Sequence, residues 1–264
     1  MYKQKIRYPK LDILRGLCLV SMIAYHTVWD LVNIYDFNWM WYRSVLAKVW
    51  QQSICWTFIL LAGFCLPMGR HHIRRGAIVF GGGALITAVT LFVMPEQPII
   101  FGVLTFIGSC VILVGLIDRH LQKIMTPVLS VAGIIISFML FAFTYSVNYR
   151  AVGVFGEELM RLPGRLYDNY FTTFLGFPPA GFASADYFSI VPWIFLFMTG
   201  YFLYFSVMKS REKVYEPGGS EKSNSEQGSS EVVDSEPGSV KRWLQCGNCK
   251  PLEWLGRHSL LVYM

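Results

Sequence analysis

The sequence predicts an all-α protein, a polytopic membrane helix bundle with six complete transmembrane helices and a truncated seventh. Of its 264 residues 54% are hydrophobic and only 15% are charged, whereas soluble domains carry about 25% charged residues. The mean hydropathy of the chain is +0.42. The apolar residues gather in runs of about 20 residues, the length that an α-helix needs to cross a bilayer.

Each predicted span follows from one apolar run. The first covers residues 11–34 and contains four ionisable residues, while the next five contain no charged residue and cover 49–68, 77–94, 99–117, 124–147 and 187–208. A last apolar run, 252–264, is shorter than a span. We expect it to be the start of a seventh transmembrane helix.

Between these runs the composition divides the chain into a membrane domain (1–208), a cytoplasmic linker (209–251) and the seventh run. Segment 216–239 is mostly Ser, Glu and Gly without aromatic residues, which predicts that the linker is largely disordered. Segment 148–186 is rich in aromatic residues, Gly and Pro. It is typical of an ordered loop or lid on the outer side.

The loops alternate in positive charge. Sixteen Lys and Arg lie in one set, which comprises 1–10, 69–76, 118–123 and 209–251; five lie in the other, which comprises 35–48, 95–98 and 148–186. Cytoplasmic loops carry the excess of Lys and Arg. We therefore expect an integral inner-membrane protein with a cytoplasmic N-terminus, and the net charge of +6 reflects this orientation and does not indicate a nucleic-acid partner.

The first span carries a polar stripe. Its ionisable residues are Asp12, Arg15, His26 and Asp30. At about 100° per residue, Arg15 and His26 fall within roughly 20° of each other on a helix, and the two aspartates lie within roughly 60° of both. Ionisable side chains at membrane depth are costly and commonly mark a site or a pathway.

The six cysteines fall into two groups. Four lie in apolar runs, where small packing residues are expected: Cys18, Cys55, Cys65 and Cys110. Cys246 and Cys249 form the pair CGNC. A zinc site needs four ligands and no second pair follows, so this pair represents either ordinary reduced thiols or a metal site shared across a homodimer; no metal is expected.

Five segments occur in one order: LDILRGLCLVSMIAYHTVWDL, FILLAGFCL, FGVLTFIG, DYFSIVPWIFLFMTGYFL and LGRHSLLVY. In this order they resemble the small bacterial membrane proteins that share the catalytic domain of heparan-alpha-glucosaminide N-acetyltransferase, a family akin to the transmembrane acyltransferases that O-acetylate surface sugars. The resemblance covers nearly all of residues 9–208 and 252–264.

The resemblance implies transfer of an acetyl or other acyl group from an acyl-CoA, such as acetyl-CoA, to a carbohydrate. The family's helix-one histidine corresponds to His26 and the arginine of its RG motif to Arg15. Its basic inner loop corresponds to Arg70, Arg74 and Arg75. The implied partners are the lipid bilayer, an acyl-CoA and a saccharide acceptor.

The residue types suit these roles, and each has a plainer alternative. Arginine forks match CoA phosphates, but Arg15 also fits an i,i+3 ion pair with Asp12, and the basic loop serves topology in any case. An imidazole such as His26 takes up a proton or an acyl group, yet histidines also occur as packing residues. Asp30, one turn on, would orient His26 or make polar contacts at the outer interface.

A competing function is non-enzymatic. In that reading the protein is a small transporter, or a solute or proton path, lined by the polar stripe of the first span. Transporters commonly show broken helices or paired halves, and neither is evident in the sequence beyond Pro192.

Overall fold

The computed structural model of the protein describes residues 8–154, 157–209 and 249–258. Six long helices run through these residues: α1 (Pro9–Asn33), α2 (Val45–Cys65), α3 (His72–Val93), α4 (Val103–Ile124), α5 (Pro127–Thr144) and α7 (Ile190–Lys209). All six are long and apolar enough to cross a membrane. The predicted all-α polytopic bundle is therefore confirmed, and the chain is an integral membrane protein.

Several helices extend beyond the apolar runs that predicted them, and α3 and α4 do so by the most residues. α3 begins at His72, so Arg74 and Arg75 lie near its start instead of in the predicted loop, and α4 continues through 118–123 to Ile124. Charged side chains such as arginine continue a helix readily. The next helix starts at Pro127, where the Thr126 side chain accepts a hydrogen bond from a backbone N–H of the first turn of α5.

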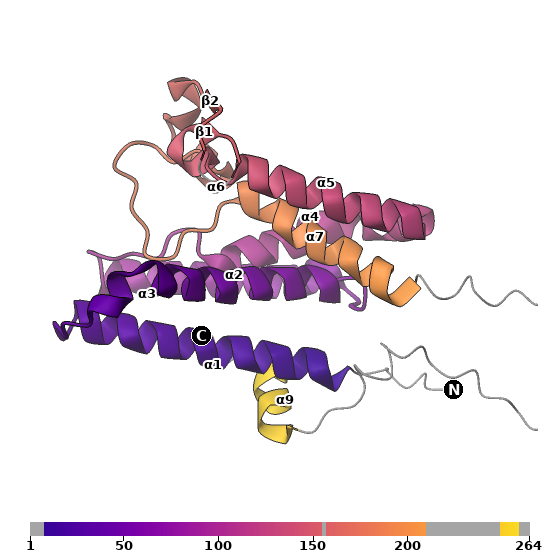
Figure 1. Ribbon diagram of the computed structural model, residues 1–264, viewed down its shortest axis with the longest axis horizontal. Coiled ribbons are helices and arrows are strands. Elements are labelled where there is room, and N and C mark those ends of the chain that lie inside the picture. Colours follow the sequence, from indigo (N-terminus) through magenta and orange to yellow (C-terminus); the bar gives the residue numbers. More distant parts are fainter. Residues whose placement is uncertain (1–7, 155–156, 210–248, 259–264) are drawn as a thin grey trace, which may run out of the picture.

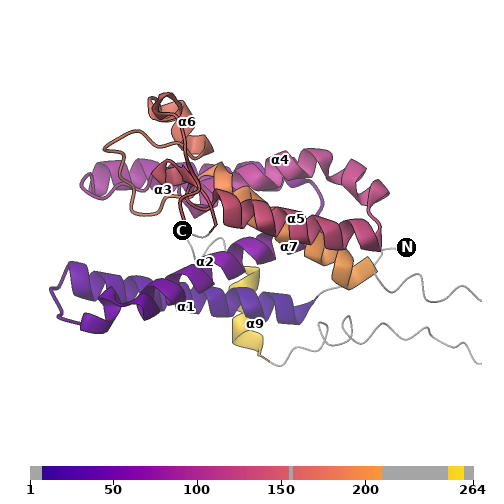
Figure 2. The same cartoon turned by 45° about the horizontal axis from the view of Figure 1, so that its top comes forward.

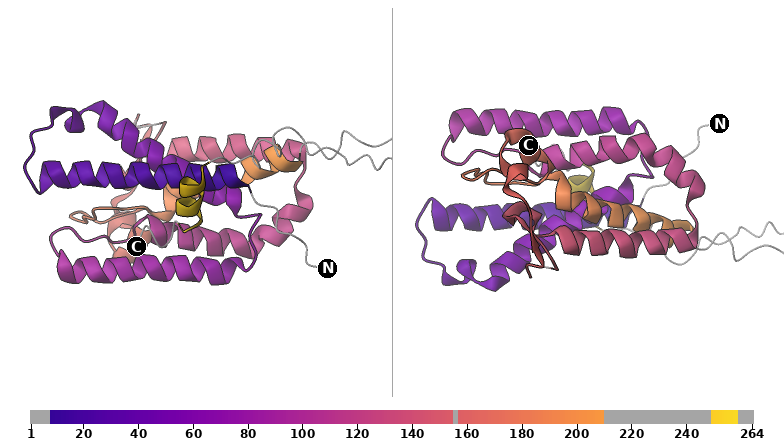
Figure 3. Two further views of the ribbon diagram at one scale, coloured as in Figure 1. Left: turned by 90° about the horizontal axis from the view of Figure 1, so that it is seen from below. Right: turned by 90° about the horizontal axis from the view of Figure 1, so that it is seen from above.

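α4 and α7 form the centre of the bundle. In their apolar stretches 56% and 50% of the residues are buried, against 22% or less in the other four spans. α4 packs beside α3, while α7 packs against both α2 and α5, and α1 lies on α2. Figure 3 shows α3 and α4 as neighbours along one edge, apart from α1. The fully buried side chains include Ile59, Phe106, Phe141, Leu196, Phe197 and Tyr201.

We call the end of the bundle at Pro9 the inner end and the opposite end the outer end. At the outer end, η1 (Met40–Arg43) precedes α2, and a folded segment joins α5 to α7. This segment contains η2 (Val147–Tyr149), η3 (Gly164–Tyr167), α6 (Tyr170–Leu175) and the short antiparallel strands β1 (Ala151–Val152) and β2 (Met160–Arg161).

Hydrogen bonds hold the outer segment together. The buried hydroxyl of Tyr167 donates to the carbonyl of Val147, and the hydroxyl of Tyr187 donates to the carbonyl of Thr173. Burial raises the pKa of Tyr187 to about 12, so its hydroxyl remains protonated and able to donate. The described part of 148–186 is thus a folded element.

A short helix, α9 (Lys250–Arg257), crosses α1 near its inner end (Figure 2). The two backbones touch. A Cβ atom at Gly16 would clash with the backbone carbonyl of Leu252, and one at Gly256 would clash with that of Asp12. α9 covers the beginning of the predicted seventh span, whose residues 259–264 lie outside the described residues, as do 210–248 of the predicted linker.

Candidate functional site

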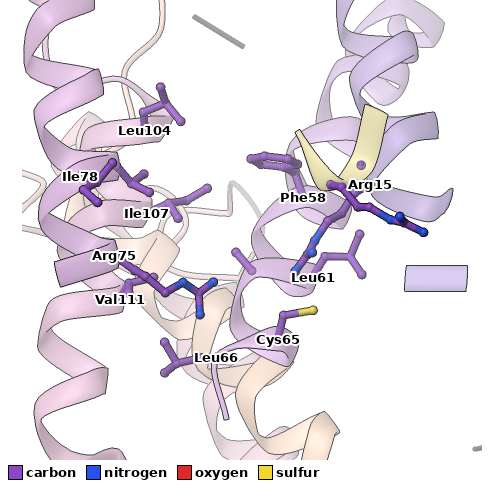
Figure 4. Close-up of a pocket in the computed structure, with 14 residues that line it drawn as sticks. Arg15, Phe58, Leu61, Cys65, Leu66, Arg75, Ile78, Leu104, Ile107 and Val111 are labelled. Atoms are coloured by element: carbon purple, nitrogen blue, oxygen red, sulfur yellow. The ribbon is translucent and has the colours of Figure 1, made fainter. Parts of the chain in front are cut away.

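An inner cavity of about 380 Å³ lies between α1, α2, α3, α4 and α9. Three arginines from three different helices line it: Arg15 from α1, Arg75 from α3 and Arg257 from α9. Most of the remaining lining is apolar and comes from α2, α3 and α4. Figure 4 shows Arg75 reaching from α3 toward the side where Cys65 and Leu66 face the same space.

The arginines of the inner cavity differ in their acidic partners. Nη1 of Arg15 lies 3.4 Å from Oδ1 of Asp12, and Nε of Arg257 lies 3.8 Å from Oδ2 of the same carboxylate. Arg257 also donates from Nη2 to Glu253 at 2.9 Å. Arg75 has no ion-pair partner among the residues that the structure describes. The cavity therefore carries an excess of positive charge, which attracts anions.

The structure separates the residues of the predicted basic loop. Arg75 lines the inner cavity together with Arg15, and their role in binding stays a prediction. All three arginines of the predicted loop are exposed, and Arg70 and Arg74 do not line the inner cavity. For Arg74 the reason is helical geometry, because neighbouring residues on α3 point about 100° apart; Arg70 precedes α3.

An outer cavity of about 570 Å³ lies between α1, α3 and the start of α4. His26 and Asp30 of α1 line it together with Asp186 from the outer segment. The carboxylate of Asp186 accepts a hydrogen bond from the backbone N–H of Val103 at 3.1 Å. This bond fixes the carboxylate at the start of α4, where the positive end of the helix dipole stabilises a negative charge.

His26 and Asp30 both line the outer cavity, but among the described residues they form no hydrogen bond with each other. The imidazole of His26 is exposed toward the cavity and has an edge contact with the ring of Tyr25, whose centroid is 6.2 Å away. A histidine placed in this way is free to meet a molecule in the cavity. The orientation of His26 by Asp30 stays a prediction.

The two cavities adjoin at Leu104 of α4, which lines both of them. The polar stripe of α1 accordingly serves two cavities: Arg15 borders the inner one, and His26 and Asp30 border the outer one. Chemically, the inner cavity suits an anionic group. The outer cavity offers an imidazole and two carboxylates, which are suitable partners for hydroxyl or amino groups.

Three site features escaped the sequence reasoning. Asp186 was part of an external loop and of one segment of the family resemblance, Arg257 was part of the segment LGRHSLLVY, and neither was assigned a role in a site. The third is a buried carboxylate, Asp118 on α4, whose Oδ2 lies 3.3 Å from Nε2 of His72. Asp118 directly follows the apolar run 99–117. Its position was the available signal, but a charged residue there fits a loop as well as a continuing helix.

No cluster of three or more His, Cys, Asp or Glu side chains suited to a metal ion occurs in the part of the chain that the structure describes. Cys249 is exposed directly before α9. Its predicted companion Cys246 lies outside the described residues. The nature of the CGNC pair therefore stays a prediction.

A family model described as "Heparan-alpha-glucosaminide N-acetyltransferase, catalytic" matches residues 7–226. No curated protein and no solved structure matches the chain. The family match covers α1 through α7 and therefore both cavities, apart from the residues that α9 contributes.

Proposed function

The chain belongs to the heparan-alpha-glucosaminide N-acetyltransferase catalytic family, a membrane acetyltransferase family, and from this premise we propose that it is a membrane-embedded acyltransferase. It moves an acetyl or other acyl group from an acyl-CoA on the cytoplasmic side to a saccharide on the outer side. The inner end of the bundle is then cytoplasmic, and the membrane is the inner, or plasma, membrane.

One observation carries this proposal: the arginine-lined cavity and the histidine-lined cavity adjoin at Leu104. An acyl-CoA carries its phosphates at one end and its thioester at the other end of a long arm. Arg15 and His26 are eleven residues apart on α1, which corresponds to roughly 16 Å along a helix. Phosphates held near Arg15 and Arg75 would direct the thioester along α1 toward His26.

In the proposed reaction, a hydroxyl or amino group of the saccharide attacks the thioester carbonyl. A C–O or C–N bond forms, the C–S bond breaks, and CoA leaves as the thiol. His26 takes the proton from the attacking group and returns it to the leaving sulfur. In a two-step variant His26 itself accepts the acyl group before the saccharide does. Asp30 is the expected orienting residue for His26.

A second candidate function uses the same geometry. Two cavities that adjoin along one polar stripe would also suit a path for a solute or a proton across the bilayer. This reading needs no acyl-CoA. Binding of acyl-CoA therefore discriminates between the two candidates.

The first experiment measures whether CoA and acetyl-CoA stabilise the full-length protein in detergent against thermal unfolding. A second assay then measures transfer of a radiolabelled acetyl group from acetyl-CoA to a simple amino sugar. We expect stabilisation by both compounds and transfer from acetyl-CoA. Lack of stabilisation and of transfer would reject the acyltransferase and favour the solute path.

A variant at the junction of the cavities sharpens this experiment. Leu104→Phe adds volume where the acyl arm would pass, so transfer should fall while CoA binding at the arginines persists. Leu113→Phe is the matched control, because Leu113 lies on the same helix and is 47% exposed. Full transfer by the folded Leu104→Phe protein would show that the acyl arm does not pass this point.

A further inference from the structure

Arg257 is the member of the inner cavity that lies farthest along the chain. Building on the acyltransferase proposed above, we propose that Arg257 is a third binding residue for the phosphates of the acyl-CoA donor. α9 then supplies part of the donor site, although it lies beyond the residues that the family model matches.

The packing of α9 against α1 places Arg257 at the inner cavity. Gly16 of α1 faces the backbone of Leu252, and Gly256 of α9 faces the backbone of Asp12, each so closely that a Cβ atom would clash. Two reciprocal glycine contacts allow a closer helix approach than larger side chains would permit. Gly256 and Arg257 consequently line the same cavity as Arg15 and Arg75.

Asp12 links the arginines of the two helices. Its Oδ1 lies 3.4 Å from Nη1 of Arg15, and its Oδ2 lies 3.8 Å from Nε of Arg257. One carboxylate thus holds two guanidinium groups beside each other. Each arginine has five N–H donors, so donors remain for a phosphate after these contacts are made.

A purely structural role for Arg257 would rest on two ion pairs, one with Glu253 four residues earlier on α9 at 2.9 Å and one with Asp12 of α1 at 3.8 Å. The Arg257 side chain is 42% exposed, and ion pairs with one partner this exposed contribute little to stability. Neither pair requires Arg257 to line a cavity beside Arg75. The arrangement of three arginines from α1, α3 and α9 instead matches a ligand with several phosphates, as arginine forks bind phosphate oxygens in pairs.

The test compares CoA with pantetheine, which shares the thiol-bearing arm of CoA but has no phosphate. Affinities of the full-length protein in detergent are measured by titration calorimetry. Arg257→Gln should lower CoA affinity about tenfold, the loss expected for one charge-assisted contact, and should lower the ratio of CoA to pantetheine affinity by the same factor. Arg257→Lys should lose less, since the charge persists.

Arg119→Gln is the matched control: it removes an exposed arginine at the inner end of α4 that does not line the cavity. A second measurement needs no variant. Phenylglyoxal modifies arginines, and CoA should protect Arg257, but not Arg119, in the wild-type protein as read by peptide mass spectrometry. This measurement decides the question if Arg257→Gln does not fold.

The outcomes separate the two proposals. Unchanged CoA affinity in Arg257→Gln, or equal modification of Arg257 with and without CoA, while Arg15→Gln weakens binding, would overturn the role of Arg257 and leave the acyltransferase standing. Wild-type protein that does not bind CoA would overturn both.

Discussion

The carboxylate of Asp118 accepts a hydrogen bond from the hydroxyl of Tyr201 at 2.8 Å and so joins α4 to α7 in the interior of the bundle. Its other oxygen accepts from the side-chain amide of Gln122 at 2.8 Å and lies 3.3 Å from Nε2 of His72 on α3. Asp118 is only 2% exposed. Three helices that border or support the inner cavity therefore meet at one buried carboxylate.

Removing this carboxylate should cost more stability than removing one of its partners. Tyr201→Phe deletes a single hydrogen bond and should lower the free energy of unfolding by about 1 kcal/mol. Asp118→Ala leaves the buried hydroxyl of Tyr201 and the partly buried side chains of Gln122 and His72 without this carboxylate and should cost about 3 kcal/mol. Reversible unfolding in mixed detergent micelles measures both values.

Tyr170→Phe serves as the control for this series, because Tyr170 is 73% exposed on α6 and should unfold like the wild type. Equal stability of Asp118→Ala and wild type would mean that the buried network does not hold the three helices together.

The orientation of the bundle gives a second prediction. With sixteen Lys and Arg in one set of loops and five in the other, a reporter fused after Lys123 should be cytoplasmic and one fused near Ala180 should be external. Alkaline phosphatase and green fluorescent protein fusions measure this pair of sites. The reverse pattern would contradict a donor site at the inner end and an acceptor site at the outer end.

The arginines of the basic segment give a third prediction, because the structure distinguishes between them. Arg75→Gln should weaken CoA binding about tenfold, since Arg75 lines the inner cavity without an acidic partner in the described residues. Arg74→Gln, its neighbour on α3, should change CoA affinity little. Calorimetric titration at low and high salt measures both, and the Arg75 effect should be larger at low salt. Equal losses of CoA affinity in the two variants would mean that both residues have only a general electrostatic or topological role.

The sequence predicted the spans well because their signal is local. A run of about 20 apolar residues identifies a membrane helix without knowledge of its neighbours. Helical periodicity likewise placed Arg15, His26 and Asp30 on one stripe, and all three line cavities on the same side of α1. The predicted ends were less accurate, since the helical conformation of α3 and α4 continues through charged residues that hydropathy assigns to loops.

Contacts between distant segments could not be predicted in this way. Tyr201 and Asp118 are 83 positions apart, and neither residue type predicts a contact with the other. The position of α9 depends on close backbone contact between Gly16 and Leu252 and between Gly256 and Asp12, which no local pattern encodes. The division of one polar stripe between two cavities also depends on where α4 places Leu104.

The last prediction concerns His26. Asparagine keeps hydrogen-bonding capacity and a similar size but does not exchange a proton near neutral pH. If His26 acts as base or acyl acceptor, His26→Asn should lower acyl transfer by about 10²-fold or more. CoA binding should persist, because the arginines line the other cavity. Asp30→Asn should reduce transfer less, since the reacting imidazole remains.

The measurement is acetyl transfer to an amino sugar by variant protein that is shown to be folded and to bind CoA. His120→Asn, an exposed histidine at the inner end of α4, is the matched control and should transfer like wild type. A His26→Asn protein that binds CoA and still turns over at the wild-type rate would remove His26 from the reaction. Because the outer cavity would then hold no reacting group assigned to it, the solute-path reading of the polar stripe would be favoured.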